Sequence, residues 1–289
     1  MSTLGICAIT GANGYVGSAI ASYFSRKGYR IVALTRREPS SEFDHIPFSL
    51  ENGLEPGALR KRRVDVIIHC AYDFGPVSWA DIKRVNVDGT RRLFQAAKHE
   101  GVSRIIVVST ISAFAGCSSL YGKAKLEMEA AARYVNASIV RPGLVYGQNC
   151  RGGMFGRLRD SVLQHRFVPL VGSGKYIQYL VHQDDLSELL FRIAQGRVSL
   201  DTPVTAACTR PWSLRQIVRE LERRENKKTS IIPVPWQLMW AGLKSAEVLG
   251  LKMKFKSDSL ISLVKQDPAP KFPNPEQIGI QFREFADER

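Results

Sequence analysis

The chain has 289 residues, of which 44% are hydrophobic and 24% charged, values typical of a globular α/β protein and unlike those of a disordered chain. Its 41 Lys and Arg outnumber its 27 Asp and Glu, so the formal net charge is +14. The basic residues are dispersed and no helix-turn-helix, RNA-binding or zinc motif accompanies them, which argues against a nucleic-acid partner. The charge then reflects either a generally basic surface or an attraction to anions such as phosphate groups or an anionic membrane.

The cysteines, histidines and apolar segments exclude several further classes. Five cysteines lie far apart without a Cys-x-x-Cys pair, and the five histidines show no ligand spacing, so we expect reduced thiols, no metal site and a cytoplasmic location. The chain enters an apolar strand at Leu4 without a signal-like segment. Because Lys244 and Glu247 interrupt the apolar stretch Trp236–Leu251, this stretch predicts a packed or interfacial helix rather than stable membrane insertion.

The first half of the chain alternates short apolar runs with helical segments. Ile- and Val-rich runs predict strands buried on both faces, at Leu4–Thr10, Arg30–Thr35, Val64–Cys70, Arg104–Ser109 and Ala137–Arg141. Apolar residues at helical spacing predict helices between them, at Tyr15–Lys27, Trp79–Glu100 and Tyr121–Tyr134. The alternation predicts an α/β fold with a doubly wound parallel sheet.

After Arg141 the pattern changes to loops and helices. Helices are predicted at Phe155–His165, Asp184–Gln195, Ser213–Glu225 with Ser213 as N-cap, and Trp236–Leu249. Four prolines beyond Asp267 predict an extended tail. We therefore expect a first domain over residues 1–147 and a small, mostly helical C-terminal lobe over residues 148–289. Residues 176–200 are the candidate segment for a return to the first domain.

A glycine-rich turn follows the first strand. Gly11, Gly14 and Gly17 form a Gly-x-x-Gly-x-x-Gly pattern between a strand and a helix. Glycines permit a tight turn and a close approach of a pyrophosphate, and the helix N-terminus offers free N–H donors. This context predicts a dinucleotide site with contacts from Gly11, Asn13, Gly14, Tyr15, Val16 and Gly17; the alternative is a tight turn without a ligand.

The end of the second strand favours one cofactor over another. An acidic residue there accepts from the ribose 2′-hydroxyl of NAD. This chain has Arg36 and Arg37 instead, and guanidinium groups suit a 2′-phosphate. NADP is therefore the preferred cofactor and NAD the alternative, unless both arginines are merely solvated surface charges.

Six ordered motifs carry a resemblance to a known family. They are Thr10–Gly17, Val66–Ala71, Asn86–Thr90, Val108–Thr110, Tyr121–Lys125 and Arg141–Gly147. Over residues 4–190 the chain resembles the NAD-dependent epimerase/dehydratase branch of the extended short-chain dehydrogenases/reductases. The resemblance implies a Rossmann-type first domain, a small-molecule substrate held by the C-terminal lobe, and a homodimer paired through the helices Trp79–Glu100 and Tyr121–Arg133.

The resemblance also implies a catalytic group of three residues. Tyr121 and Lys125 are four residues apart on one helix and share a face. A nearby ammonium and an oxidised nicotinamide favour the phenolate of Tyr121, which then exchanges a proton with the substrate oxygen. Lys125 would also hold the nicotinamide ribose. Thr110 would orient the substrate oxygen, with Ser112 as the next candidate and Ser109 as a neighbour that could be mistaken for it.

Further cofactor and substrate contacts come from the same resemblance. It implies cofactor contacts from Ser49, Leu50, Cys70, Ala71, Tyr72, Asn86, Tyr121, Lys125, Pro142, Gly143 and Val145. Asn86 is largely structural in the family, and turn geometry alone could equally explain Pro142 and Gly143. Substrate contacts are expected from Thr110, Ser112, Tyr121 and Arg151.

Three departures from the family pattern bear on the substrate. Ser49 stands where the family usually has an Asp near the adenine, Leu144 where nucleotide-sugar enzymes often have an Asn, and Gln178 where they often have a diphosphate-binding Arg. Other arginines could supply that clamp or be solvated surface charges: Arg151, Arg157, Arg159 and Arg210.

The leading hypothesis is therefore a reductase or dehydrogenase that transfers hydride between NADP(H) and a secondary alcohol or ketone of a sugar-type, possibly nucleotide-linked, substrate. A nucleotide-sugar epimerase with bound NAD is the alternative within the same chemistry. A non-catalytic dinucleotide-binding protein is the alternative of another class.

Overall fold

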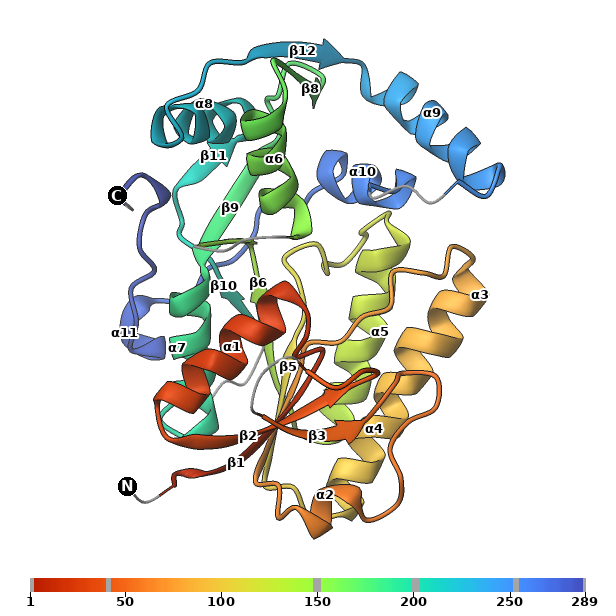
Figure 1. The fold of residues 1–289 in the computed structure, drawn as a ribbon, viewed down its shortest axis with the longest axis vertical. Helices are drawn as coiled ribbons and strands as arrows, with labels where there is room; N and C mark the ends of the chain where they lie inside the picture. Colours follow the sequence, from red (N-terminus) through yellow and green to blue (C-terminus); the bar gives the residue numbers. More distant parts are fainter. Residues whose placement is uncertain (1–2, 40–42, 148–151, 199–202, 252–254, 288–289) are drawn as a thin grey trace.

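The computed structural model describes residues 3–39, 43–147, 152–198, 203–251 and 255–287 (Figure 1). Its main sheet has seven strands in the order β10-β6-β5-β4-β1-β2-β3, and every neighbouring pair is parallel. The strands are β1 (Gly5–Thr10), β2 (Tyr29–Thr35), β3 (Asp44–Pro47), β4 (Val66–His69), β5 (Arg104–Val108), β6 (Ser138–Pro142) and β10 (Val204–Ala206). The order reverses between β1 and β4, and ligands bind at the carboxyl ends of strands beside such a point. The predicted doubly wound sheet is confirmed.

Helices cover both faces of this sheet, which explains the unbroken apolar strands. Helices α1 (Tyr15–Arg26) and α7 (Gln183–Ala194) pack together on one face, where Cys7 and Ile9 of β1 are buried. Helices α4 (Asp88–His99) and α5 (Leu120–Tyr134) pack on the other face, where Ala8 is buried. A single turn, α2 (Ala58–Lys61), packs Leu59 into the same core. Alternate residues of one strand therefore serve two cores.

The predicted helix Trp79–Glu100 is wrong in its interior. The structure has α3 (Trp79–Ile82), a π-helical segment η1 (Lys83–Val87) and then α4. Strands β3 and β10 are also absent from the sequence prediction, because runs of three or four residues at the sheet edges carry too little pattern to recognise.

In its described residues the C-terminal lobe has four helices, of which the sequence analysis predicted all but α10, and two small sheets that it did not predict. The helices are α6 (Gly153–Gln164), α8 (Leu214–Arg224), α9 (Trp236–Val248) and α10 (Ser257–Val264). One sheet joins β11 (Pro211–Ser213), β9 (Ile177–His182) and β7 (Leu144–Tyr146); the other joins β12 (Ser230–Val234) to β8 (Phe167–Val171). The predicted N-cap Ser213 is confirmed, and it forms a capping box with Gln216.

Two segments beyond residue 147 lie in the first domain. Helix α7 packs on α1, and β10 pairs with β6. The tail prediction is wrong locally, because α11 (Pro275–Ile278) forms one helical turn and η2 (Phe285–Asp287) a 3₁₀ turn. Proline fits the first position of α11, where its missing N–H would have no helical partner. Among the helices that the structure describes, none has both the length and the apolarity to cross a membrane.

Candidate functional site

A cleft of about 2260 Å³ opens at the carboxyl ends of the main sheet and is closed on its far side by the C-terminal lobe. It collects nearly all of the predicted site residues. The described ones that line it are Gly11, Asn13, Gly14, Tyr15, Val16, Gly17, Arg36, Arg37, Ser49, Leu50, Cys70, Ala71, Tyr72, Thr110, Ser112, Tyr121, Lys125, Pro142, Gly143 and Val145. Arg151 lies outside the described residues. The topology thus brings motifs more than a hundred residues apart to one edge of the sheet.

The glycine-rich turn is shaped by close backbone contacts. Gly11 has a φ of +68°, a left-handed conformation that favours glycine. A Cβ on Gly17 would lie 2.2 Å from the carbonyl oxygen of Gly11, so only glycine lets α1 start this close to the turn. The N-cap Gly14 has no side chain to occupy the first N–H groups of α1. This turn therefore presents a helix N-terminus that suits a phosphate.

A buried hydroxyl aligns the end of β4 beside this turn. The Oγ1 atom of Thr10 accepts hydrogen bonds from the backbone N–H groups of Cys70 and Ala71, each at 3.0 Å. The ring of His69 bridges Thr10 and Thr90, at 2.8 Å and 2.9 Å. Burial lowers the pKa of His69 to about 3, so its imidazole is neutral and acts as a structural link rather than an acid or base.

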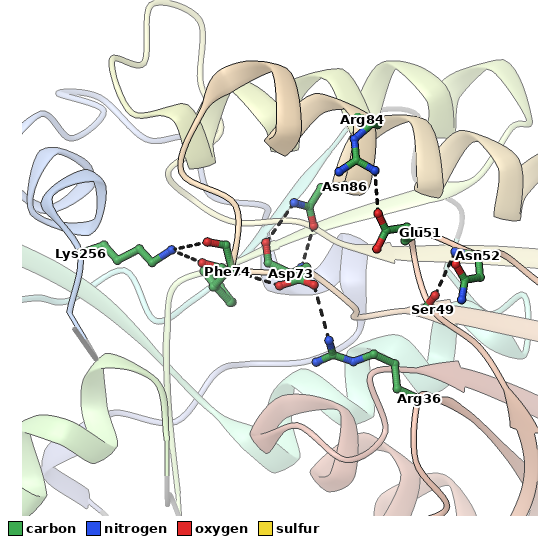
Figure 2. A network of polar contacts seen from close by, with 10 residues as sticks. Arg36, Ser49, Glu51, Asn52, Asp73, Phe74, Arg84, Asn86 and Lys256 are labelled. Atoms are coloured by element: carbon green, nitrogen blue, oxygen red, sulfur yellow. Dashed lines mark hydrogen bonds and ion pairs between the residues drawn. The ribbon is translucent and has the colours of Figure 1, made fainter. Parts of the chain in front are cut away.

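Asn86 holds the loop after β4 from behind the cleft. Its Nδ2 donates to the Asp73 carbonyl oxygen at 3.0 Å, and its Oδ1 accepts from the Asp73 N–H at 2.7 Å (Figure 2). Asn86 is fully buried in the π-helical segment and is absent from the cleft lining. The predicted cofactor contact of Asn86 is thus replaced by a structural one, since its amide is occupied by the backbone of Asp73.

The predicted catalytic lysine, Lys125, is buried at the wall of the cleft. The Nζ of Lys125 donates to the carbonyl oxygen of Val108 at 3.0 Å and lies 5.4 Å from the centre of the Tyr72 ring. Burial lowers the pKa of Lys125 to about 8. The ammonium is therefore easier to discharge than that of a surface lysine.

Tyr121 is enclosed by aromatic rings. Its ring meets Tyr72 edge-on with centroids 4.9 Å apart and stacks on Phe74 at 5.7 Å. Burial raises the pKa of Tyr121 to about 12, and a hydrogen bond with Thr110 acts in the opposite direction. The expected phenolate is not favoured by the protein's own groups, because desolvation outweighs them. At neutral pH the phenol keeps its proton, which is the form that protonates a carbonyl oxygen.

The structure separates the three hydroxyls near Tyr121. Ser109 donates to the buried Glu129 carboxylate at 2.6 Å, and that carboxylate also binds Arg141, so the Ser109 hydroxyl has a structural partner. The Oγ1 of Thr110 accepts from the Ser112 N–H at 3.2 Å and reaches Tyr121. Thr110 is therefore the hydroxyl best placed to act with Tyr121.

The N-terminus of α5 is capped from two directions. Ser119 accepts from the Gly122 N–H at 3.1 Å. Asp258 of α10, in the C-terminal lobe, accepts from the N–H groups of Leu120 and Tyr121 at 2.7 Å and 2.9 Å. The first three N–H groups of α5 thus all have acceptors. No sequence motif signals Asp258, since it lies 137 residues from Tyr121.

The two arginines after β2 differ in their surroundings. Arg36 forms an exposed ion pair with Asp73 at 3.6 Å (Figure 2). The carbonyl oxygen of Arg37 accepts hydrogen bonds from the side chains of Asn13 and Thr35. The exposed guanidinium of Arg37 has no ion-pair partner among the described residues. Of the two, Arg37 carries the charge that is less compensated by the protein.

Ser49 is also engaged by its own turn. Its hydroxyl oxygen accepts from the Asn52 N–H at 2.9 Å. The same turn is anchored by an ion pair of 2.7 Å between Glu51 and Arg84 (Figure 2). The Ser49 hydroxyl can therefore still donate a hydrogen bond toward the cleft.

The lobe side of the cleft distinguishes among the candidate clamp arginines. Arg159 pairs with Glu225 at 2.6 Å and Arg210 with Glu284 at 2.5 Å, so both have acidic partners away from the cleft. Arg157 lines the cleft, and burial lowers its pKa.

Other lobe contacts explain the turn after β6 and bridge the cleft mouth. A Cβ on Gly143 would lie 2.1 Å from the Tyr179 carbonyl oxygen, so strand packing requires this glycine. Lys256 donates to the carbonyl oxygens of Phe74 and Gly75 (Figure 2). Sequence reasoning missed Lys256, because a lone lysine outside any motif carries no signal.

Within the described ranges no three His, Cys, Asp or Glu side chains gather as a metal site.

Comparison with known proteins places this site in a family. The model of the NAD dependent epimerase/dehydratase family matches residues 7–204. An uncharacterized protein of Mycobacterium tuberculosis is 25% identical over 221 residues, which cover 75% of this chain and 23% of that protein. A ceramide reductase of Caulobacter vibrioides is 33% identical over 153 residues, or 50% of this chain and 47% of the reductase. The chain thus spans less than half the length of either relative.

A solved structure shares the fold over most of its length. MoeE5 in complex with UDP-glucose and NAD has a TM-score of 0.67 and 21% identity, and the match covers 90% of this chain and 98% of MoeE5. The family match includes the glycine turn, Thr110, Tyr121 and Lys125. The chain therefore belongs to the NAD dependent epimerase/dehydratase family, whose members are enzymes of the extended short-chain dehydrogenase type.

Proposed function

We propose that the protein is an NADPH-dependent reductase of a ketone on a sugar-type substrate. A bound NADPH would supply the hydride. Tyr121 donates its phenolic proton to the carbonyl oxygen, and the Thr110 hydroxyl orients that oxygen. Lys125 holds the ribose next to the nicotinamide and carries positive charge near the phenolate that remains.

The observation that carries the proposal is the shared cleft. Thr110, Tyr121 and Lys125 open into the same space as the glycine-rich turn and Arg37. The raised pKa of Tyr121 favours the proton-donating form, which suits reduction better than oxidation. The name of the ceramide reductase, a relative over half of this chain, supports the same direction.

The NADP preference is tested by titrating the purified protein with NADPH and NADH, followed by fluorescence. We expect tighter binding of NADPH. Arg37→Ala should reduce this preference more than Arg36→Ala, because Asp73 already compensates the Arg36 charge. Tighter binding of NADH, or NAD retained through purification, would overturn the cofactor assignment and favour the epimerase.

The residues on the lobe side of the cleft favour a substrate with an anionic group, but they lack the Asn and Arg that nucleotide-sugar enzymes often have. Leu144 and Gln178 line the cleft where nucleotide-sugar enzymes often have Asn and Arg, while Arg157 offers a cation from α6. We propose that Arg157 binds an anionic group of the substrate. Arg157→Gln should raise the KM and leave NADPH binding unchanged, whereas an unchanged KM would remove this role.

The nucleotide-sugar epimerase remains the second candidate, because the family name and the UDP-glucose complex of MoeE5 point to it. Cofactor stoichiometry separates the two enzymes. A reductase consumes one NADPH for each product molecule, and an epimerase consumes none. A non-catalytic dinucleotide-binding protein would keep its biological activity in Tyr121→Phe. Pairing through α4 and α5 into a homodimer is a further proposal, which sedimentation of the purified protein tests.

A further inference from the structure

Helix α9 differs from the other long helices of the described chain because it buries none of its residues. The shorter α10 buries Ser257, Leu260 and Leu263. Yet α9 is predominantly apolar, with Lys244 and Glu247 as its two charged residues. An amphipathic helix of a globular protein normally turns its apolar residues inward. Trp236, Met239 and Leu243 of α9 pack partly buried against the lobe core. On the opposite side Leu238, Trp240 and Val248 are exposed together with polar residues such as Gln237 and Lys244.

Exposed apolar residues occur on α9, directly after it and on the strands β8 and β12. We call this set the apolar edge, and its members are Phe167, Ile232, Leu238, Val248, Leu249 and Leu251, which are 54%, 44%, 68%, 78%, 74% and 58% exposed. Phe167 and Ile232 lie on the neighbouring strands β8 and β12, which run along the same end of the molecule as α9 (Figure 1).

The charges around the apolar edge are almost all positive. Residues 226–251 contain three lysines and one acid, Glu247. The carboxylate of Glu247 is 11% exposed and accepts from the N–H and hydroxyl of Ser257. Lys227 and Lys228 are exposed directly before β12, and Arg166 precedes Phe167 on β8. Apolar side chains with a basic rim match an anionic lipid surface.

The apolar edge also adjoins the cleft mouth. Trp240, on α9, is 38% exposed and lines the cleft together with Lys244. Phe74 and Val77 also line the cleft and are 59% and 56% exposed. Trp side chains favour the interface between lipid and water. A membrane in contact with α9 would therefore lie close to the part of the cleft that Trp240 and Lys244 line.

We propose that the protein docks peripherally on anionic membranes through the apolar edge, with Arg166, Lys227 and Lys228 facing the lipid headgroups. A second copy of the chain fits this surface less well, because its own exposed cations Arg166, Lys227 and Lys228 would come near the same cations of the first copy. Docking is independent of the proposed reductase activity, since Tyr121→Phe removes turnover without touching the apolar edge.

Co-sedimentation of the full chain with vesicles tests the proposal. We expect binding to vesicles that contain phosphatidylglycerol, weaker binding at high salt, and little binding to pure phosphatidylcholine. The triple variant Leu238→Gln, Val248→Gln and Leu249→Gln should lose affinity for anionic vesicles by about tenfold or more, since each side chain leaves the lipid. The control Tyr134→Gln changes a residue that is 79% exposed on α5 and should bind as the wild type does.

Three outcomes would overturn the proposal. The first is no binding of the wild-type protein to anionic vesicles at low salt. The second is binding of the triple variant to anionic vesicles with the affinity of the wild type, which would mean that charge attraction alone causes the binding. The third is a wild-type dimer that the triple variant converts to a monomer, because the apolar edge would then be covered by a second copy. Circular dichroism of the triple variant checks that the lobe remains folded.

Discussion

The two sides of the cleft are built from different parts of the polypeptide. The cofactor side consists of backbone in close contact, such as the approach of Gly17 to Gly11 and the N–H groups of Cys70 and Ala71 on Thr10. The lobe side consists of side chains on helices, such as Arg157 and Lys244. A position in close backbone contact accepts few residue types. A side chain on a helix can be replaced by another without changing the path of the backbone. The glycine-turn side therefore carries motifs that can be recognised in the sequence, and the lobe side does not.

The two sides meet at the start of the catalytic helix. Asp258 belongs to the lobe, and its carboxylate accepts from the backbone N–H of Tyr121. The position of the general acid thus depends on a contact that crosses from one side to the other. The following substitutions test separately the proton transfer by Tyr121, the backbone packing of the glycine-rich turn and the contact between Asp258 and α5.

The largest effect is expected from Tyr121→Phe. Loss of the phenolic proton should lower kcat by about 10²- to 10⁴-fold, the usual contribution of a general acid. NADPH affinity should change little, because the glycine-rich turn is untouched. Turnover and fluorescence titration of the same preparation measure both quantities. A kcat close to that of the wild type would show that another group supplies the proton.

The pH dependence of stability should reveal the buried Lys125. Its pKa in the folded chain is about 8, below the ordinary value of 10.5, so the folded chain loses this proton first as the pH rises. Below pH 8 both states hold the proton and the cost of burying the ammonium is complete. Between pH 8 and 10.5 that cost is relieved, so the free energy of unfolding should rise relative to Lys125→Met by up to about 3 kcal/mol.

Urea unfolding of the wild type and Lys125→Met across this pH range measures the difference. The comparison with the variant removes the contribution of the other titrating groups. A constant difference between the two proteins would mean that burial does not alter the Lys125 pKa.

Alanine at two glycines separates the backbone-built side from the lobe. Gly17→Ala places a Cβ 2.2 Å from the Gly11 carbonyl oxygen, and should lower the free energy of unfolding by about 1–3 kcal/mol as well as weaken NADPH binding. Gly242→Ala on α9 meets nothing within 4 Å and should stabilise the helix by about 0.5–1 kcal/mol. Denaturant midpoints compare the two variants; equal effects would contradict the tight packing of the turn.

The last change tests the contact between the C-terminal lobe and α5. Asp258→Asn keeps the shape of the side chain but removes its charge and leaves one acceptor oxygen for two N–H groups, so the free energy of unfolding should fall by about 1–2 kcal/mol and kcat should fall with it. Asp81→Asn is the control, because Asp81 is an exposed acid in the first turn of α3. If kcat of Asp258→Asn equals that of the control, the lobe does not position Tyr121.

Some features could be predicted from sequence because they depend on local physics. The strand-to-helix turn at Gly11–Gly17 needs glycine for steric reasons, and the i, i+4 spacing of Tyr121 and Lys125 places both on one face of α5. Strands β1, β2, β4, β5 and β6 were recognisable because helices on both faces require continuous apolar runs. The π-helical segment at Lys83–Val87 could not be recognised in the sequence, since its residues have an ordinary helical pattern.

Other features were decided by contacts between distant residues. The choice of Thr110 over Ser109 depends on Glu129 engaging the Ser109 hydroxyl, and the protonated state of Tyr121 depends on burial by Tyr72 and Phe74. Asp258 reaches the catalytic helix only because α10 packs against α5. By itself the sequence determined the parallel sheet, the dinucleotide turn and the family, since these follow from short-range sterics and periodicity. The tertiary structure alone decided which hydroxyl contacts Tyr121, which arginine after β2 lacks an ion-pair partner among the described residues and which apolar helix stays exposed, because burial and charge depend on neighbours far away in the chain.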